Sequence, residues 1–96
     1  MPTYARTERF LREFRRLSPE MRAAFLAARD EFIADADSGR FRPSLRVKRV
    51  RSARGRVFEM SFAADGRATF RMDPGAVREG KMHITWLRIG DHSILD

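Results

Sequence analysis

The stretch that decides the fold is residues 41–70, which read FRPSLRVKRVRSARGRVFEMSFAADGRATF. Apolar and polar side chains alternate through most of it, which is typical of β-strands with one buried and one exposed face. The first expected strand sets two apolar residues between cations (Leu45, Arg46, Val47, Lys48). The alternation breaks at Arg49-Val50, which predicts a strand end or a bulge there. Ser52-Ala53-Arg54-Gly55 is then expected to be a turn.

Two further strands follow, joined by a hairpin. Phe58, Met60 and Phe62 share one face of the next expected strand. Ala63-Ala64-Asp65-Gly66 closes it, because Asp-Gly is among the strongest short hairpin signals. The returning strand directs three apolar residues to the core (Ala68, Phe70, Met72). After a polar loop from Asp73 to Gly80, residues 82–89 complete the sheet.

Helices are expected before this stretch. Thr7 has the character of an N-cap, and apolar residues at helical spacing follow it (Phe10, Leu11, Phe14, Leu17). Ser18-Pro19-Glu20 starts a second helix that runs to about Ser38, with Gly39 at its C-cap. The two-residue joint predicts an antiparallel helical hairpin. The alternation of residues 3–6 is too brief to decide whether they form a first strand.

These elements predict a single α+β domain over residues 1–96. We expect two layers, with the N-terminal helical hairpin packed on a three- to four-stranded antiparallel sheet. No apolar run approaches the ~20 residues that span a bilayer, and no signal-peptide pattern follows Met1. The chain has no cysteine, which fits the reducing cytoplasm, where we expect the protein.

The charge is strongly positive. The formal net charge is +7, and residues 40–56 carry eight cations and no acid (Arg40, Arg42, Arg46, Lys48, Arg49, Arg51, Arg54, Arg56). Arginine abundance alone often reflects genome composition, but clustering on one sheet favours a polyanionic partner, either a nucleic acid or an acidic protein.

With these elements in place, the chain resembles the RelE/ParE superfamily of type II toxin–antitoxin toxins, in its RelE/YafQ-like mRNA-cleaving branch. The resemblance covers the helical hairpin, the LRVKRVR strand, the FEMSFAADGRATF hairpin and the final WLRIGDHSIL. It implies a RelE-like fold, a toxin that cleaves mRNA, usually on the ribosome, and a co-expressed acidic antitoxin. We expect no metal site, because the two histidines lie nine residues apart among scattered carboxylates, a spacing that matches no common ligand pattern. We also expect no cofactor and no membrane partner.

The resemblance also implies site residues. His92 takes the position of the catalytic histidine, Asp65 matches an acid of the same branch, and Arg88 matches a basic residue before the Ile-Gly step. With Arg67, these are the expected catalytic residues. Four cations are the expected RNA contacts (Arg46, Lys48, Arg51, Arg71). Three positions depart from the branch, where Ser61 replaces a histidine, Gly66 an aromatic and Leu95 a terminal aromatic.

The chemistry of these residue types agrees with that expectation. RNA supplies its own 2′-OH nucleophile, so the protein needs a proton donor or acceptor and cations for the phosphate. An imidazole such as that of His92 exchanges protons near neutral pH. Guanidinium groups match phosphate oxygens in geometry. Four other residues could serve the site, but each also has a structural explanation. Asp65 suits the turn, Glu59 suits an ion pair on the cationic face, His83 suits a strand edge, and Trp86 suits packing in the core.

Two other functions remain open at this point. A ParE-like toxin would inhibit DNA gyrase by binding, without catalysis and without need of a histidine. A degenerate toxin would survive only as an antitoxin-bound or RNA-binding module, which the residues at positions 61 and 95 favour.

Overall fold

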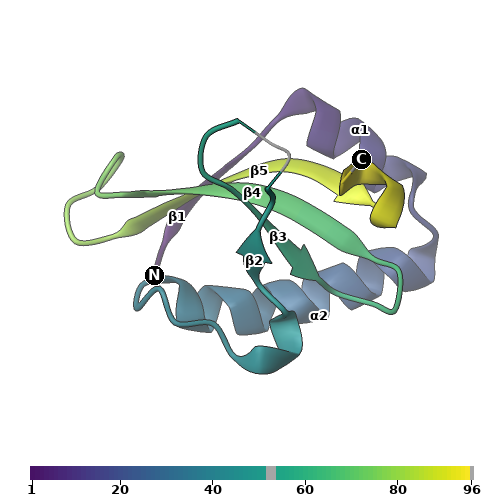
Figure 1. Ribbon diagram of the computed structural model, residues 1–96, viewed down its shortest axis with the longest axis horizontal. Helices are drawn as coiled ribbons and strands as arrows, with labels where there is room; N and C mark the ends of the chain where they lie inside the picture. Colours follow the sequence, from purple (N-terminus) through teal and green to yellow (C-terminus); the bar gives the residue numbers. More distant parts are fainter. Residues whose placement is uncertain (52–53, 96) are drawn as a thin grey trace.

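The computed structural model describes residues 1–51 and 54–95. Within these residues a five-stranded sheet packs on two α-helices (Figure 1). The strands are β1 (Thr3–Arg6), β2 (Lys48–Arg49), β3 (Val57–Ser61), β4 (Arg67–Pro74) and β5 (Met82–Gly90). The helices are α1 (Glu8–Arg16) and α2 (Pro19–Ala36), with two short 3-10 helices, η1 (Pro43–Leu45) and η2 (His92–Leu95). The described part has no helix with the length and apolar character needed to cross a membrane.

Both α-helices start where the sequence predicts. The hydroxyl of Thr7 accepts a hydrogen bond from the N–H of Phe10 at 3.0 Å, and that of Ser18 accepts one from Met21 at 3.2 Å. Each cap satisfies an N–H that the first helical turn leaves unpaired. The second helix ends at Ala36, two residues before the predicted end, and Gly39 follows with a φ of +71°.

The core lies between α2 and one face of the sheet. The helix places four residues at helical spacing against the strands (Phe25, Ala28, Phe32, Ala36). Phe32 is 1% exposed, and its ring lies 4.8 Å edge-on from Phe70 and 5.0 Å from Trp86. Burial of a side chain of this size stabilises the fold by ~1.5–3 kcal/mol. The prediction that Trp86 packs in the core is confirmed, since it is 3% exposed.

The sheet has the order β1-β5-β4-β3-β2, with β1 parallel to β5 and the other pairs antiparallel. The two-layer α+β class is confirmed. Four antiparallel strands are present as expected, and β1, which the sequence left undecided, adds a fifth, parallel strand in the described part. Its partner is far away in sequence: Thr3 pairs with His83, and the Thr3 Oγ1 and His83 Nδ1 atoms lie 2.8 Å apart.

A bulge between β4 and β5 sets the faces of the last strand. Thr69 pairs with Arg88 and Phe70 with Trp86, so Leu87 is left without a partner opposite. The extra residue lets Trp86 and Ile89 both face the core, although strict alternation would place them on opposite faces. It also turns Arg88 away from the core. Strict alternation along residues 82–89 would have put Arg88 on the same face as Trp86, and the bulge prevents this.

The segment before the loop is less extended than predicted. Residues 43–45 form η1, and Arg46 has left-handed dihedral angles, with a φ of 49°. The strand starts only at Lys48 and ends at Arg49, which confirms the predicted strand end. Pro43 suits the first position of a helical turn, and this explains why alternation misled here. Of the predicted turn at residues 52–55, Ser52 and Ala53 lie outside the described residues.

Candidate nucleic-acid interface

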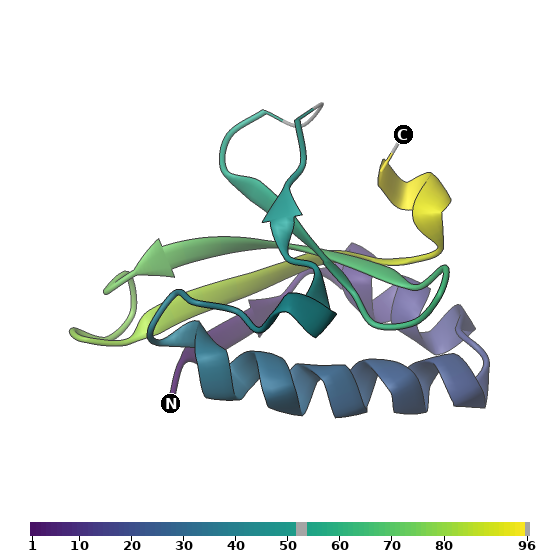
Figure 2. The same cartoon turned by 60° about the horizontal axis from the view of Figure 1, so that its bottom comes forward.

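One face of the sheet is covered by α2, and neither α-helix covers the other (Figure 2). We call this other face the open face; its side chains include six from β2, β3, β4 and β5 (Lys48, Glu59, Thr69, Arg71, Thr85, Arg88). The β2–β3 loop and the C-terminal tail both rise from it, as Figure 2 shows. They flank the middle of the sheet from two sides.

The pairing register sets four of these residues in one row across the sheet. Lys48 lies opposite Glu59, Glu59 opposite Thr69, and Thr69 opposite Arg88. Glu59 is only 5% exposed, and the Lys48 Nζ lies 3.6 Å from its carboxylate. Glu59 therefore forms the ion pair that the sequence favoured, with a lysine as its partner. Lys48 remains largely exposed and offers donors to a ligand.

Not all cations of residues 40–56 are available to a polyanion. Arg42 bonds both oxygens of Asp35, at 2.9 and 3.1 Å, and an oxygen of Glu31 at 2.9 Å. The side-chain hydrogen bonds between Arg42 and Asp35 are the main reason why the pKa of Asp35 is lowered and the pKa of Arg42 is raised. Arg42 therefore ties the segment after α2 to that helix.

Other cations of this run have no ion pair within the described residues (Arg40, Arg46, Arg49, Arg51, Arg54, Arg56). Arg51 and Arg54 lie in the β2–β3 loop beside the open face. Arg46 follows η1 and lines two cavities whose other walls include Ala28, Glu31 and Phe41. Arg46 thus lies between α2 and the end of the row, and it lines one of these cavities together with Lys48.

The tail places His92 at the start of η2. Its N–H donates to the Asp65 carboxylate at 3.2 Å, which ties the tail to the tip of the β3–β4 hairpin. The imidazole has no hydrogen-bond partner among the described residues, and the side chain is exposed. Two hydrogen bonds from Ser93 are the main reason why the pKa of Asp91 is lowered, and the electrostatic interaction with the His92 side chain adds to them.

Arg67 stabilises the β3–β4 hairpin. Its Nη1 donates to the carbonyl oxygens of Ala63, Ala64 and Gly66, at 2.9 to 3.4 Å. A Cβ at Gly66 would lie 2.5 Å from the ring of Phe62, so that ring occupies the space beside position 66. Arg67 and Phe62 together shape the hairpin tip that carries Asp65.

Arg88 is held by the first helix. Its Nη2 bonds the Glu13 carboxylate at 2.7 Å, and its Nη1 donates to the carbonyl oxygen of Ile94 at 3.4 Å. Glu13 also accepts from the N–H of Ile89 at 3.4 Å, on the part of β5 that extends past β1. Sequence patterns missed Glu13, because they showed only that it lies outside the apolar stripe of α1.

Partial burial alone would raise the pKa of Glu13. The hydrogen bond and charge of Arg88, the N–H of Ile89 and the charge of Arg9 outweigh burial, so this pKa is lowered. The ion pair therefore contributes stability above the pKa of Glu13 in the unfolded chain. That contribution is lost as the pH falls through the lower pKa of the folded state.

The predicted site residues thus fall into two groups. Hydrogen bonds connect Asp65 and Arg88 to the tail that carries His92. Lys48 and Arg71 lie on the open face, on β2 and β4, and Arg46 and Arg51 lie in the segments on either side of β2. Arg71 is exposed, and its contact with Asp73 at 3.7 Å is weak because both groups are solvated.

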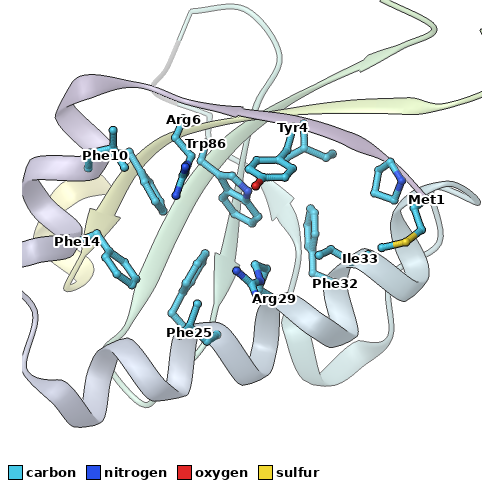
Figure 3. A pocket seen from close by; sticks show the side chains of 14 residues that line it. Met1, Tyr4, Arg6, Phe10, Phe14, Phe25, Arg29, Phe32, Ile33 and Trp86 are labelled. Atoms are coloured by element: carbon cyan, nitrogen blue, oxygen red, sulfur yellow. The ribbon is translucent and has the colours of Figure 1, made fainter. Parts of the chain in front are cut away.

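A separate apolar groove of about 290 Å³ lies on the helical side of the sheet (Figure 3). Its walls come from β1, α1, α2 and β5. Of the four large apolar side chains that the described part exposes, three line it (Met1, Tyr4, Leu26). Figure 3 shows the Arg6 and Arg29 guanidinium groups pointing into it. The Arg29 Nε is buried there, with no hydrogen-bond partner among the described residues.

Comparisons with known proteins identify this arrangement of helices and strands. Comparison with protein-family models and with curated proteins found no match. Solved structures match over nearly the whole chain. The YafQ-containing DinJ–YafQ complex of Escherichia coli matches with a TM-score of 0.69 and 9% identity, over 99% of this chain and 98% of the other.

The chain has the fold of the RelE/YafQ-like toxins. A metal-bound toxin from Helicobacter pylori shares this fold, with a TM-score of 0.66, 13% identity and full coverage of both chains. A YoeB/ParE toxin from Agrobacterium tumefaciens matches with a TM-score of 0.65 and 11% identity, over 94% of this chain and 98% of that one. At such identities the likeness establishes the RelE/YafQ-like fold, and function must be argued from the site.

The described residues contain no cluster of three or more His, Cys, Asp or Glu side chains that could hold an ion.

Proposed function

We propose that this chain is the toxin of a type II toxin–antitoxin pair and that it cleaves mRNA on the ribosome, with RNA bound on the open face. The observation that carries the proposal is the position of the tail. Hydrogen bonds from Arg88 to Ile94 and from His92 to Asp65 tie it to one end of the sheet whose open face carries exposed cations, and the imidazole has no hydrogen-bond partner among the described residues. The toxin folds of the matched structures support the same proposal.

The proposed reaction uses the nucleophile of the RNA itself. The 2′-oxygen attacks the adjacent phosphorus, the bond from phosphorus to the 5′-oxygen breaks, and a 2′,3′-cyclic phosphate forms. One group takes the 2′-OH proton and another gives a proton to the departing 5′-oxygen. His92 serves as the general acid or base, without a metal. Asp65 positions the backbone of His92, and cations of the open face and loop stabilise the phosphate.

RNA binding should depend on the exposed cations and not on Arg42. We expect Lys48→Ala, Arg51→Ala and Arg71→Ala each to reduce the salt dependence of binding to single-stranded RNA. Each lost phosphate contact releases fewer counterions and lowers the slope of log K against log salt by about 0.7. Fluorescence anisotropy at several salt concentrations measures this slope.

Arg42→Ala is the matched control for that experiment. It removes the same charge from the same basic run, but its guanidinium is bonded to Asp35 and Glu31. Its slope should equal that of the unsubstituted protein. Equal slopes for Arg42→Ala and for the three open-face and loop variants would show that these cations do not contact phosphate.

The antitoxin partner is proposed to bind in the apolar groove. One matched structure is a complex of YafQ with DinJ, which supports a protein partner. The groove combines exposed apolar side chains with two cations, Arg6 and Arg29, so the complementary occupant is an acidic amphipathic helix. Such a helix would add a second helical neighbour to α2 and would pair the buried Arg29 Nε.

Leu26→Asp should prevent neutralisation by the antitoxin without removing toxicity. The aspartate would stand in the apolar groove and repel an acidic partner. The measurement is growth on co-expression of the toxin with its antitoxin. Val77→Asp is the control, because Val77 is also apolar and exposed but does not line the groove. Full rescue of the Leu26→Asp strain would place the antitoxin elsewhere, for example over the basic sheet.

A further inference from the structure

Glu13 connects α1, near the start of the chain, to the C-terminal tail, which lies beside this helix (Figure 1). Its side chain is only 18% exposed, although it belongs to a helix with many solvated charges. Three groups face it: the guanidinium of Arg88 at 2.7 Å, the N–H of Ile89 at 3.4 Å, and the more distant Arg9 at 3.9 Å. Both carboxylate oxygens of Glu13 therefore accept hydrogen bonds from residues near the end of β5.

Arg88 links Glu13 to the C-terminal tail. One end of its guanidinium bonds Glu13, and the other donates to the carbonyl of Ile94. Ile94 also packs closely on the end of β5, since a Cβ added at Gly90 would lie 2.8 Å from its Cγ2. An arginine side chain has several rotatable bonds, so its direction must be set by its partners. Glu13 is the partner that turns Arg88 toward the tail.

We propose that Glu13 is a positioning residue for His92, acting through Arg88. This inference rests on the proposed function for the role of His92. In this arrangement Arg88 holds η2 in place, and its charge is largely balanced by Glu13. Phosphate stabilisation then belongs to other cations, such as Lys48 and Arg71. The first helix thus contributes to the site without contacting RNA.

The hold on the tail can be tested without any assay of activity. In Glu13→Ala, hydrogen exchange of the Ser93 and Ile94 amides should become about tenfold faster, because the charge-assisted bond that directs Arg88 is lost. Arg88→Ala should have a similar effect, and the double variant should exchange no faster than Arg88→Ala alone. Glu8→Ala is the control, since it removes an exposed acid from the same helix.

Unchanged exchange in Glu13→Ala would overturn the inference. So would fully additive effects in the double variant, because Glu13 would then act by another route. Glu13→Gln separates charge from shape. It retains an acceptor for the N–H of Ile89 and should still loosen the tail, whereas a tail as well ordered as in the unsubstituted protein would contradict a role for the ion pair.

RNA cleavage supplies the second readout. Displacement of a reacting group by about 1 Å can cost ~100-fold in rate, so kcat should fall at least tenfold in Glu13→Ala while KM for RNA changes little. A raised KM with unchanged kcat would overturn the positioning role. If the unsubstituted protein cleaves no RNA, the proposed function fails, and the exchange experiment still decides whether Glu13 holds the tail.

Discussion

Expression of His92→Ala should leave cell growth unaffected, whereas expression of the unsubstituted protein should arrest it. Loss of a general acid or base typically lowers the rate ~10²–10⁴-fold. His92 is exposed, and its contact with Asp65 uses the backbone N–H, which alanine retains. The fold and the tail should therefore survive, and only the chemistry should be lost. Inducible expression with primer extension on a cellular message measures both growth and cleavage.

Asp65→Asn is the companion variant. An asparagine still accepts a hydrogen bond from the His92 N–H, so it should retain most of the toxicity if Asp65 only positions the tail. Undiminished growth arrest by His92→Ala would rule out the nuclease mechanism. It would favour the alternative in which a ParE-like toxin acts by binding alone.

The largest effect on stability is expected for Phe32→Ala. Phe32 joins α2 to the sheet through ring contacts with Phe41, Phe70 and Trp86, and it is 1% exposed. Its truncation should lower the free energy of unfolding by ~3–5 kcal/mol, because it removes buried apolar surface and leaves a cavity. Domains of this size have ~5–15 kcal/mol in total. Urea unfolding followed by tryptophan fluorescence measures the change.

Val77→Ala is the control for this experiment. Val77 is 64% exposed in the β4–β5 loop, so its truncation should change the free energy of unfolding by less than ~0.5 kcal/mol. A loss below about 1 kcal/mol for Phe32→Ala would show that α2 does not depend on this contact. The arrangement of the core between α2 and the sheet would then need revision.

Local signals were sufficient to predict most of the fold. The capping residues Thr7 and Ser18 and the Asp65-Gly66 turn each act through neighbours in sequence, and the structure has all three. The alternation of Ala68, Phe70 and Met72 likewise predicts that they face the core, where the first two are buried and Met72 is half-buried.

Features that depend on distant contacts could not be predicted. The parallel pairing of β1 with β5 joins the two ends of the chain, and four residues carry too little alternation to indicate it. The bulge at Leu87 becomes visible only when β5 is set beside β4. For the site, the sequence indicated where cations cluster. It did not indicate that Arg42 and Arg88 form ion pairs with acids on α2 and α1.

The central claim is that RNA binds on the open face, between the β2–β3 loop and the tail. Titration of the labelled protein with a short single-stranded RNA, followed by NMR chemical shifts, tests it most directly. We expect shift changes at Glu59, Thr69 and Arg71 and along residues 91–95, with little change at Leu26 and Arg29 in the groove. Changes confined to the groove, or to α2, would contradict the account.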